Sequence, residues 1–185
     1  MDMLKLRYLV SLASVIACLT VAPRAAGEYP LTLTLDAKAS TGATAVISTV
    51  TVRVAKLMEE SRWKRVTDAL KYGGFANFMA ALRPLPAIGT IEFAGRSVEI
   101  KYAREGPPAP VRRLVILGDG PLFFMGGDAA KSRAGYQLTI IELLFDPDGG
   151  ITGTMAGAAR VKPSPDGVVL DDYSQTPVQL SGRTP

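Results

Sequence analysis

The sequence contains no histidine and only one cysteine, Cys18. Zinc, haem and blue-copper sites that are built from imidazole or thiolate ligands are therefore excluded. Ser-His-Asp triads and Cys-His pairs are excluded for the same reason. Any catalysis would have to depend on carboxylates, lysine, tyrosine, serine or backbone amides. We therefore expect neither a metal nor a cofactor, and we assign no catalytic residue from the sequence.

Excess charge of one sign is also lacking. The formal net charge is +4 over 185 residues, and no basic run is interleaved with aromatic residues. Nucleic acid binding requires a strongly basic surface, so nucleic acid is not an expected partner. The hydrophobic fraction of 48% is enough to form one sizeable core. We expect a single domain over residues 28–185.

Long apolar runs are absent except near the N-terminus. There, two basic residues precede the apolar run 8–22, and the small residues 25–27 follow it. This order is typical of a secretory signal peptide with cleavage before Glu28. The run is shorter than the roughly 20 residues that a membrane-spanning helix needs. We therefore predict that residues 1–27 form a signal peptide and that the protein is periplasmic or secreted.

The single cysteine lies inside this leader and allows a second interpretation. The segment Val15-Ile16-Ala17-Cys18 resembles the lipobox of bacterial lipoproteins, in which the cysteine is acylated and becomes the mature N-terminus. Hydrophobic residues continue after Cys18, however, which favours a small apolar residue within an ordinary signal core. Both interpretations stay open. A lipid on Cys18 is the only membrane contact that we expect.

Most of the mature chain has the alternating or β-branched pattern of β-strands. We interpret the small residues 37–43 as a turn, and Gly95-Arg96 as a two-residue hairpin turn. The segments are short and follow one another closely, which favours antiparallel pairing. The expected strands are 29–36, 46–57, 90–94, 97–103, 112–117, 122–125, 136–146, 151–161, 168–170 and 177–180.

One segment, at about 59–82, has a helical period instead. Trp63, Val66 and Leu70 lie on one helical face, and Gly73-Gly74 then interrupts the pattern before it resumes. We predict a helical pair here, with the tryptophan against the sheet. The fold class is α+β: a mainly antiparallel sheet of roughly seven to ten strands that is open, a sandwich or a partly closed barrel.

Several stretches are similar to a family of exported bacterial proteins of unknown function. They are Gly153–Pro163 (GTMAGAARVKP), Asp171-Asp-Tyr173 and Thr176-Pro-Val178 in the tail, with Ala69–Gly74 and Arg133–Tyr136 earlier in the chain. The resemblance covers most of the mature chain. It implies no activity, cofactor or catalytic residue.

Two short motifs suggest chemistry that their surroundings do not support. Asp146-Pro-Asp148-Gly149 looks like the opening of a calcium loop, but no closing glutamate follows and strands flank it, so we interpret it as a β-turn. Ser61-Arg-Trp-Lys64 matches the Ser-x-x-Lys spacing of penicillin-binding enzymes. The partner motifs of those enzymes do not occur here, which favours a solvated helix face.

The candidate site is placed in the tail. Asp172 and Tyr173 are the preferred binding residues, and Arg133 and Arg160 are possible partners for an anion. Lys131-Ser132-Arg133 could form a small anion-binding nest beside the glycines that precede it. The alternative is a polar tail that ion pairs hold to the sheet, with the basic loop solvated.

Two hypotheses of function remain. The first is a non-enzymatic envelope module that binds a protein or a small apolar ligand on or inside its sheet. The second is a small periplasmic hydrolase that uses a pair of carboxylates, for which two acidic side chains must face each other across a cleft.

Overall fold

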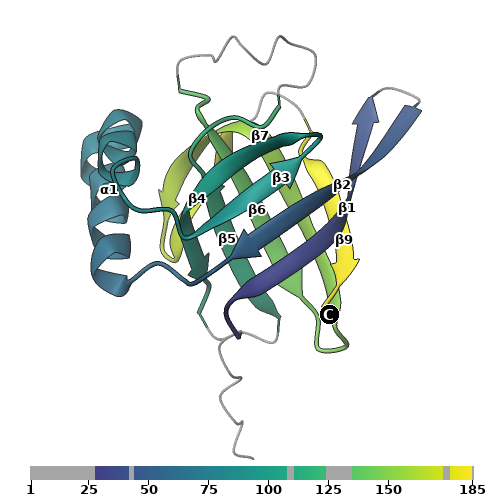
Figure 1. Cartoon of the computed structure of the whole chain (residues 1–185). Helices are drawn as coiled ribbons and strands as arrows, with labels where there is room; N and C mark the ends of the chain where they lie inside the picture. The colour runs from purple at the N-terminus through teal and green to yellow at the C-terminus, as the bar shows by residue number, and fades with distance from the viewer. Residues whose placement is uncertain (1–27, 42–43, 108–110, 124–134, 173–175, 185) are drawn as a thin grey trace, which may run out of the picture.

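The computed structural model describes residues 28–41, 44–107, 111–123, 135–172 and 176–184, and these form nine strands and one helix (Figure 1). The fold is α+β and mainly antiparallel, as predicted. The elements are β1 Leu31–Thr41, β2 Thr44–Val54, α1 Glu60–Leu82, β3 Gly89–Phe93, β4 Arg96–Glu105, β5 Arg112–Gly118, β6 Leu138–Phe145, β7 Gly150–Ser164, β8 Gly167–Asp172 and β9 Val178–Arg183.

Eight of these strands close into a barrel. Their order is β6-β5-β4-β3-β2-β1-β9-β7, and β6 also pairs with β7, which joins the two ends of the sheet. All pairings are antiparallel, and the C-terminal strand β9 lies between β1 and β7. The sheet is therefore a closed ring, more fully closed than the open or partly closed forms that the sequence predicts. Strand β8 lies outside the ring and pairs only with the far end of β7.

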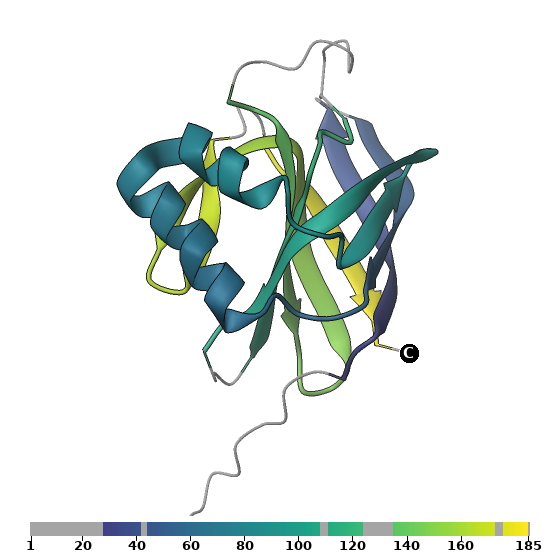
Figure 2. The same ribbon diagram turned by 60° about the vertical axis from the view of Figure 1, so that its left-hand side comes forward.

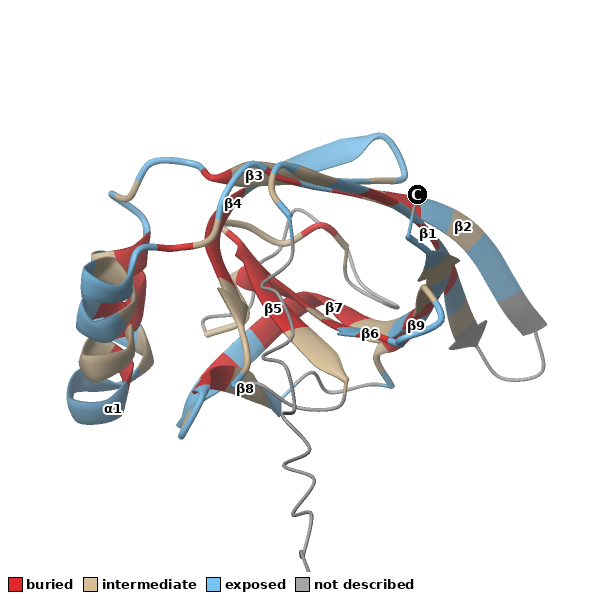
Figure 3. Cartoon of the chain, turned by 90° about the horizontal axis from the view of Figure 1, so that it is seen from below, coloured by how far each residue is buried: buried red, intermediate tan, exposed pale blue. Residues whose placement is uncertain are grey.

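The interior of the barrel is filled with apolar side chains. Leu33 of β1 is opposite Val52 of β2, which is opposite Ile91 of β3, and all three are buried. Across the ring, Ile141 of β6 is opposite Met155 of β7. Figure 3 shows the ring from below, with buried residues along every strand of the wall. An eight-stranded barrel is just wide enough for side chains to fill it, and they do so here.

Polar contacts are placed at the two ends of β5. At one end the Thr139 hydroxyl, which is fully buried, donates to the Gly120 carbonyl at 2.9 Å and accepts from the Leu122 amide at 3.2 Å. At the other end the Glu105 carboxylate accepts hydrogen bonds from Tyr29 and Arg112, each at 2.8 Å. These contacts satisfy the polar groups that border the apolar interior.

Helix α1 lies on the outside of the ring, beside β7 and β8, in both Figure 1 and Figure 2. The predicted helical pair is one helical element in which only Gly74 leaves helical geometry, with φ 72° and ψ −173°. This backbone conformation is essentially restricted to glycine, so the sequence located the kink but not the continuity of the helix. Trp63 lies against the sheet, as predicted, and bonds to Tyr102 of β4.

Three local predictions were wrong. Residues 37–41 continue β1: Ala37 is buried on the same face as Leu35, and its small side chain hides the strand pattern. The hairpin turn is Ala94-Gly95, both with positive φ, one residue earlier than predicted. Residues 122 and 123 are not in a strand: the Leu122 amide makes isolated hydrogen bonds to the Thr139 hydroxyl of β6 and the Gly157 carbonyl of β7. The predicted residues 124 and 125 lie outside the described ranges.

Candidate functional site

A groove of about 650 Å3 lies on the outside of the barrel, between α1 and the turn of the β7–β8 hairpin. This volume is within the range of about 300–1,000 Å3 that small-molecule sites usually have. One wall comes from α1 and the other from the turn of the hairpin. The lining residues are Trp63, Lys64, Thr67, Asp68, Lys71, Pro163, Ser164, Pro165 and Gly167.

The helical wall is one face of the N-terminal half of α1. Trp63, Thr67 and Lys71 follow one another at four-residue spacing, which places them along one line of the helix. The Thr67 hydroxyl donates to the Trp63 carbonyl at 2.9 Å, so its methyl group is held in a fixed direction. Lys64 and Asp68 form an ion pair at 2.8 Å along the same face.

The hairpin wall is formed by Pro163, Ser164 and Pro165, followed by Gly167. The Ser164 Oγ is buried and has no hydrogen-bond partner among the described residues. Buried polar atoms are normally satisfied, so this hydroxyl is an unusual feature of the wall. Gly167 has φ 126°, and a Cβ there would lie 2.4 Å from the Tyr102 hydroxyl. Glycine is therefore needed for the hairpin to approach Tyr102 of β4 this closely.

Trp63 forms the fixed base of the groove. Its Nε1–H donates to the Tyr102 hydroxyl at 3.1 Å, and the Arg104 guanidinium lies 4.4 Å from its ring centroid. Arg104 is held in turn by Glu60 at 2.6 Å. Burial raises the pKa of Tyr102 to about 12, so this hydroxyl is protonated at neutral pH. The indole is thus held from its edge and from one face.

The two lysines that line the groove differ in whether a carboxylate pairs with them. The Lys64 ammonium is paired with Asp68, whereas Lys71 has no carboxylate within ion-pair distance in the described part of the chain. Among the described residues, the Lys71 ammonium lies near the ring of its neighbour Tyr72, 5.2 Å from the ring centroid. Asp166, in the hairpin turn, interacts electrostatically with Arg113 on β5. Among the described lining residues, Lys71 is therefore the one charged side chain without an ion-pair partner.

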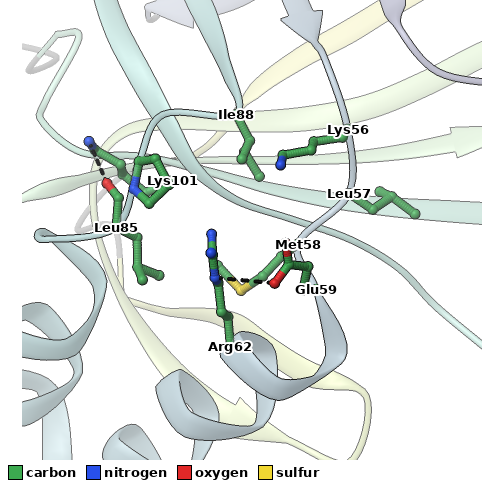
Figure 4. A pocket seen from close by; sticks show the side chains of 9 residues that line it. Lys56, Leu57, Met58, Glu59, Arg62, Leu85, Ile88 and Lys101 are labelled. Atoms are coloured by element: carbon green, nitrogen blue, oxygen red, sulfur yellow. Dashed lines mark hydrogen bonds and ion pairs between the residues drawn. The ribbon is translucent and has the colours of Figure 1, made fainter.

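Two other hollows are poorer candidates. Figure 4 shows a cavity at the start of α1, between Lys56, Arg62 and Lys101, with a volume of about 10 Å3. That volume is enough for about one water molecule. The Lys101 ammonium is occupied by the Leu85 carbonyl and Glu99, both at 2.8 Å. The second hollow, of about 380 Å3, is a shallow surface beside the β3–β4 turn.

The sequence placed its candidate site elsewhere on the same hairpin. Arg160 and Asp172 lie opposite each other in the β7–β8 pairing, and the Tyr136 hydroxyl donates to Asp172. Arg160 and Asp172 are therefore brought together, at the end of the hairpin away from the groove. Arg133 and Tyr173, like Cys18, lie outside the described residues.

The carboxylates of the described residues are mostly engaged with basic side chains. Nine ion pairs use nine different carboxylates, among them Glu105 with Arg112 at 2.7 Å and Glu142 with Arg113 at 2.6 Å. In the groove, the described lining contains one carboxylate, Asp68, and it is paired. Within the described ranges, no three acidic or sulfur side chains gather in a metal-binding group.

Comparisons with protein-family models, curated proteins and solved structures give no match to this chain. Over the described residues, α1 is too polar to be a membrane-spanning helix.

Proposed function

We propose that the protein is an exported, non-enzymatic binding module that holds its ligand in the groove between α1 and the β7–β8 hairpin. The observation that carries the proposal is a preformed hollow of ligand size, with Trp63 held at its base by Tyr102 and Arg104. A rigid aromatic surface with a few polar groups around it is typical of small-molecule sites.

The packing of the barrel supports an external site over an internal one. Side chains such as Leu33, Val52, Ile91 and Ile141 fill the interior and are almost completely buried. A ligand inside the ring would have to displace several of them. The groove requires no such rearrangement, because the space between α1 and the β7–β8 hairpin is already open.

A hydrolase that uses two carboxylates has less support. Such chemistry needs two acidic groups that face each other across the bound substrate. Of the described residues that line the groove, only Asp68 is acidic, and Lys64 compensates its charge. This arrangement favours binding without reaction.

The groove is well suited to a direct test because Trp63 is the only tryptophan in the chain. Phenylnaphthylamine, a neutral dye that fluoresces in apolar sites, should accept excitation energy from this indole when it is bound. The variant Thr67→Phe places a ring in the middle of the groove. We expect it to weaken dye binding by about tenfold or more, which corresponds to about 1.4 kcal/mol.

The matched control is Arg65→Phe, which puts the same ring on an exposed position of α1 outside the groove. We expect this variant to bind the dye like the wild type. If both variants bind the dye equally well, the ligand does not lie in the groove and the proposal fails.

We also propose that export removes residues 1–27. A chain that begins at Glu28 keeps Tyr29, whose hydroxyl bonds to Glu105 at the end of the barrel. The intact mass of the protein from the cell envelope distinguishes the two forms of processing. A mass that begins at Glu28 supports cleavage after Gly27, and an acylated mass that begins at Cys18 supports a lipid anchor instead.

A further inference from the structure

We propose that the ligand of the groove is an organic anion with an apolar body. This inference rests on the proposed function and adds the chemical class of the ligand. It follows from the distribution of charge, hydrogen-bonding groups and apolar surface over the two walls.

The charge argument concerns two lysines on the same face of α1. Lys64 and Lys71 are seven residues apart, which is about 10 Å along a helix axis. Asp68 lies between them and pairs with Lys64 at 2.8 Å, so the first lysine is neutralised. Lys71 keeps its full charge within the groove. An anionic ligand group would supply the missing counter-charge.

The second argument concerns the opposite wall. The buried Ser164 hydroxyl has no partner among the described residues, and a hydroxyl is a hydrogen-bond donor that an anionic oxygen can accept from. The chain covers this oxygen, and rotation about χ1 of Ser164 would bring it to the surface of the groove. A buried hydroxyl without a partner is costly, so a ligand oxygen that bonds to it there would stabilise the complex. A wholly apolar ligand would leave it unsatisfied.

The remaining lining requires an apolar body. Trp63, Pro163 and Pro165 present rings, and the lysine stems add aliphatic surface. A cationic ligand is disfavoured, because the one carboxylate of the described lining, Asp68, is already paired and Lys71 would repel it. The combination of ring surface, one free ammonium and one free hydroxyl fits an amphiphilic acid.

The test uses two dyes with the same body and different charge. Anilinonaphthalene sulfonate is an anion, and phenylnaphthylamine is its neutral counterpart without the sulfonate. Energy transfer from Trp63 reports that each dye is bound to the protein, and the effect of Thr67→Phe locates it in the groove. We expect the sulfonate to bind more tightly than the neutral dye at low salt, and the difference to shrink as salt is added.

Two variants test whether the preference for the sulfonate over the neutral dye arises in the groove. Lys71→Gln should weaken binding of the sulfonate by roughly threefold to fivefold, the size of one exposed ion pair, and leave the neutral dye unchanged. Ser164→Ala should also weaken binding of the sulfonate while the thermal midpoint stays the same or rises, since no intramolecular bond is lost. The control is Lys38→Gln, an exposed lysine on β1, which should change neither dye.

The outcomes separate this inference from the proposed function. Equal affinity for the two dyes, or equal effects of Lys71→Gln and Lys38→Gln, would overturn the anionic ligand and leave the groove as the binding site. Binding of both dyes that is insensitive to Thr67→Phe would overturn the groove itself, and the anionic ligand with it.

Discussion

At the scale of single residues, Tyr102 connects the wall of the barrel to α1. Its side chain is completely buried, and its hydroxyl accepts the hydrogen bond from Trp63. Gly167 approaches the same hydroxyl so closely that no larger residue fits. One phenol therefore positions both the helix and the hairpin, and with them the two walls of the groove.

Removing this hydroxyl should lower the stability of the protein. We expect Tyr102→Phe to reduce the free energy of unfolding by about 1–2 kcal/mol, because the Trp63 Nε1–H is left without an acceptor. Urea denaturation followed by circular dichroism measures the change. Tyr72→Phe is the control, since Tyr72 is 77% exposed and its loss should change stability by less than about 0.5 kcal/mol. Equal effects of the two variants would contradict the role of Tyr102.

The same residue predicts how stability changes at high pH. Burial raises the pKa of Tyr102 from its ordinary value of 10.0 to about 12, so the folded state keeps a proton that the unfolded state loses. The contribution of the protonated Tyr102 side chain to the free energy of unfolding is fully present below pH 10, and it is lost as the pH rises towards 12. We expect a loss of about 2–3 kcal/mol in the free energy of unfolding over this interval.

Tyr102→Phe separates this effect from the general loss of stability in alkali. The pKa of Tyr29 is also raised, by burial and by its bond to Glu105, so the variant should still lose some stability. Its loss between pH 10 and pH 12 should nevertheless be smaller than that of the wild type. Parallel curves for the two proteins would show that Tyr102 does not titrate as described.

At the scale of elements, the alternation of side chains predicted most strands, because a strand with one buried face must alternate. The prediction failed where that signal is weak or where the tertiary structure overrides it. Ala37 is buried like Leu35 but is too small to mark the pattern, so the end of β1 resembles a turn. Leu122 is apolar because it covers one end of the barrel, not because it belongs to a strand.

The β3–β4 turn offers a stabilising substitution. Ala94 has φ 49° and Gly95 has φ 75°, the left-handed pair of a type I′ turn, in which asparagine is preferred at the first position. We expect Ala94→Asn to raise the free energy of unfolding by about 0.5–1 kcal/mol. Differential scanning calorimetry detects it as a higher melting temperature. Gly95→Ala should have the opposite effect, and an unchanged melting temperature in both variants would contradict this turn geometry.

At the scale of the whole molecule, the ring depends on its last strand. β9 pairs with β1 on one side and with β7 on the other, and its Leu180 lies opposite Ala37 and Gly153. Without β9 both neighbours would become exposed strand edges, which invite aggregation. The closure joins segments far apart in the sequence, which is why the pattern of strands did not reveal it.

A charge inside this strand should open the ring. We expect Leu180→Asp to unfold the protein or to reduce its stability by several kcal/mol, because an unpaired carboxylate would be buried in the apolar interior. The adjacent variant Gln179→Asp points outwards and should cost less than about 0.5 kcal/mol. Size-exclusion chromatography with circular dichroism compares the two. A folded, monomeric Leu180→Asp would contradict the position of β9 in the barrel.

The sequence did not reveal the groove, because its walls come from segments that are far apart in the chain. Its walls lie about 100 residues apart in the chain, at 63–71 and 163–167. The sequence marked Trp63 as a residue that covers the sheet and Lys64 as part of a solvated helix face, and both interpretations hold. The one local signal was the line of Trp63, Thr67 and Lys71 along the helix, which mixes aromatic, polar and basic residues. Nothing in it points to the hairpin opposite.

Strand β8 is bonded to the ring along a single edge, through its pairing with β7. The loop that joins these two strands can therefore vary in length and composition while the eight strands of the barrel keep their register. Thermal stability and ligand specificity therefore depend on different parts of the chain. Replacing residues 165 and 166, which join the two strands, should change what the protein recognises and leave its melting temperature unchanged.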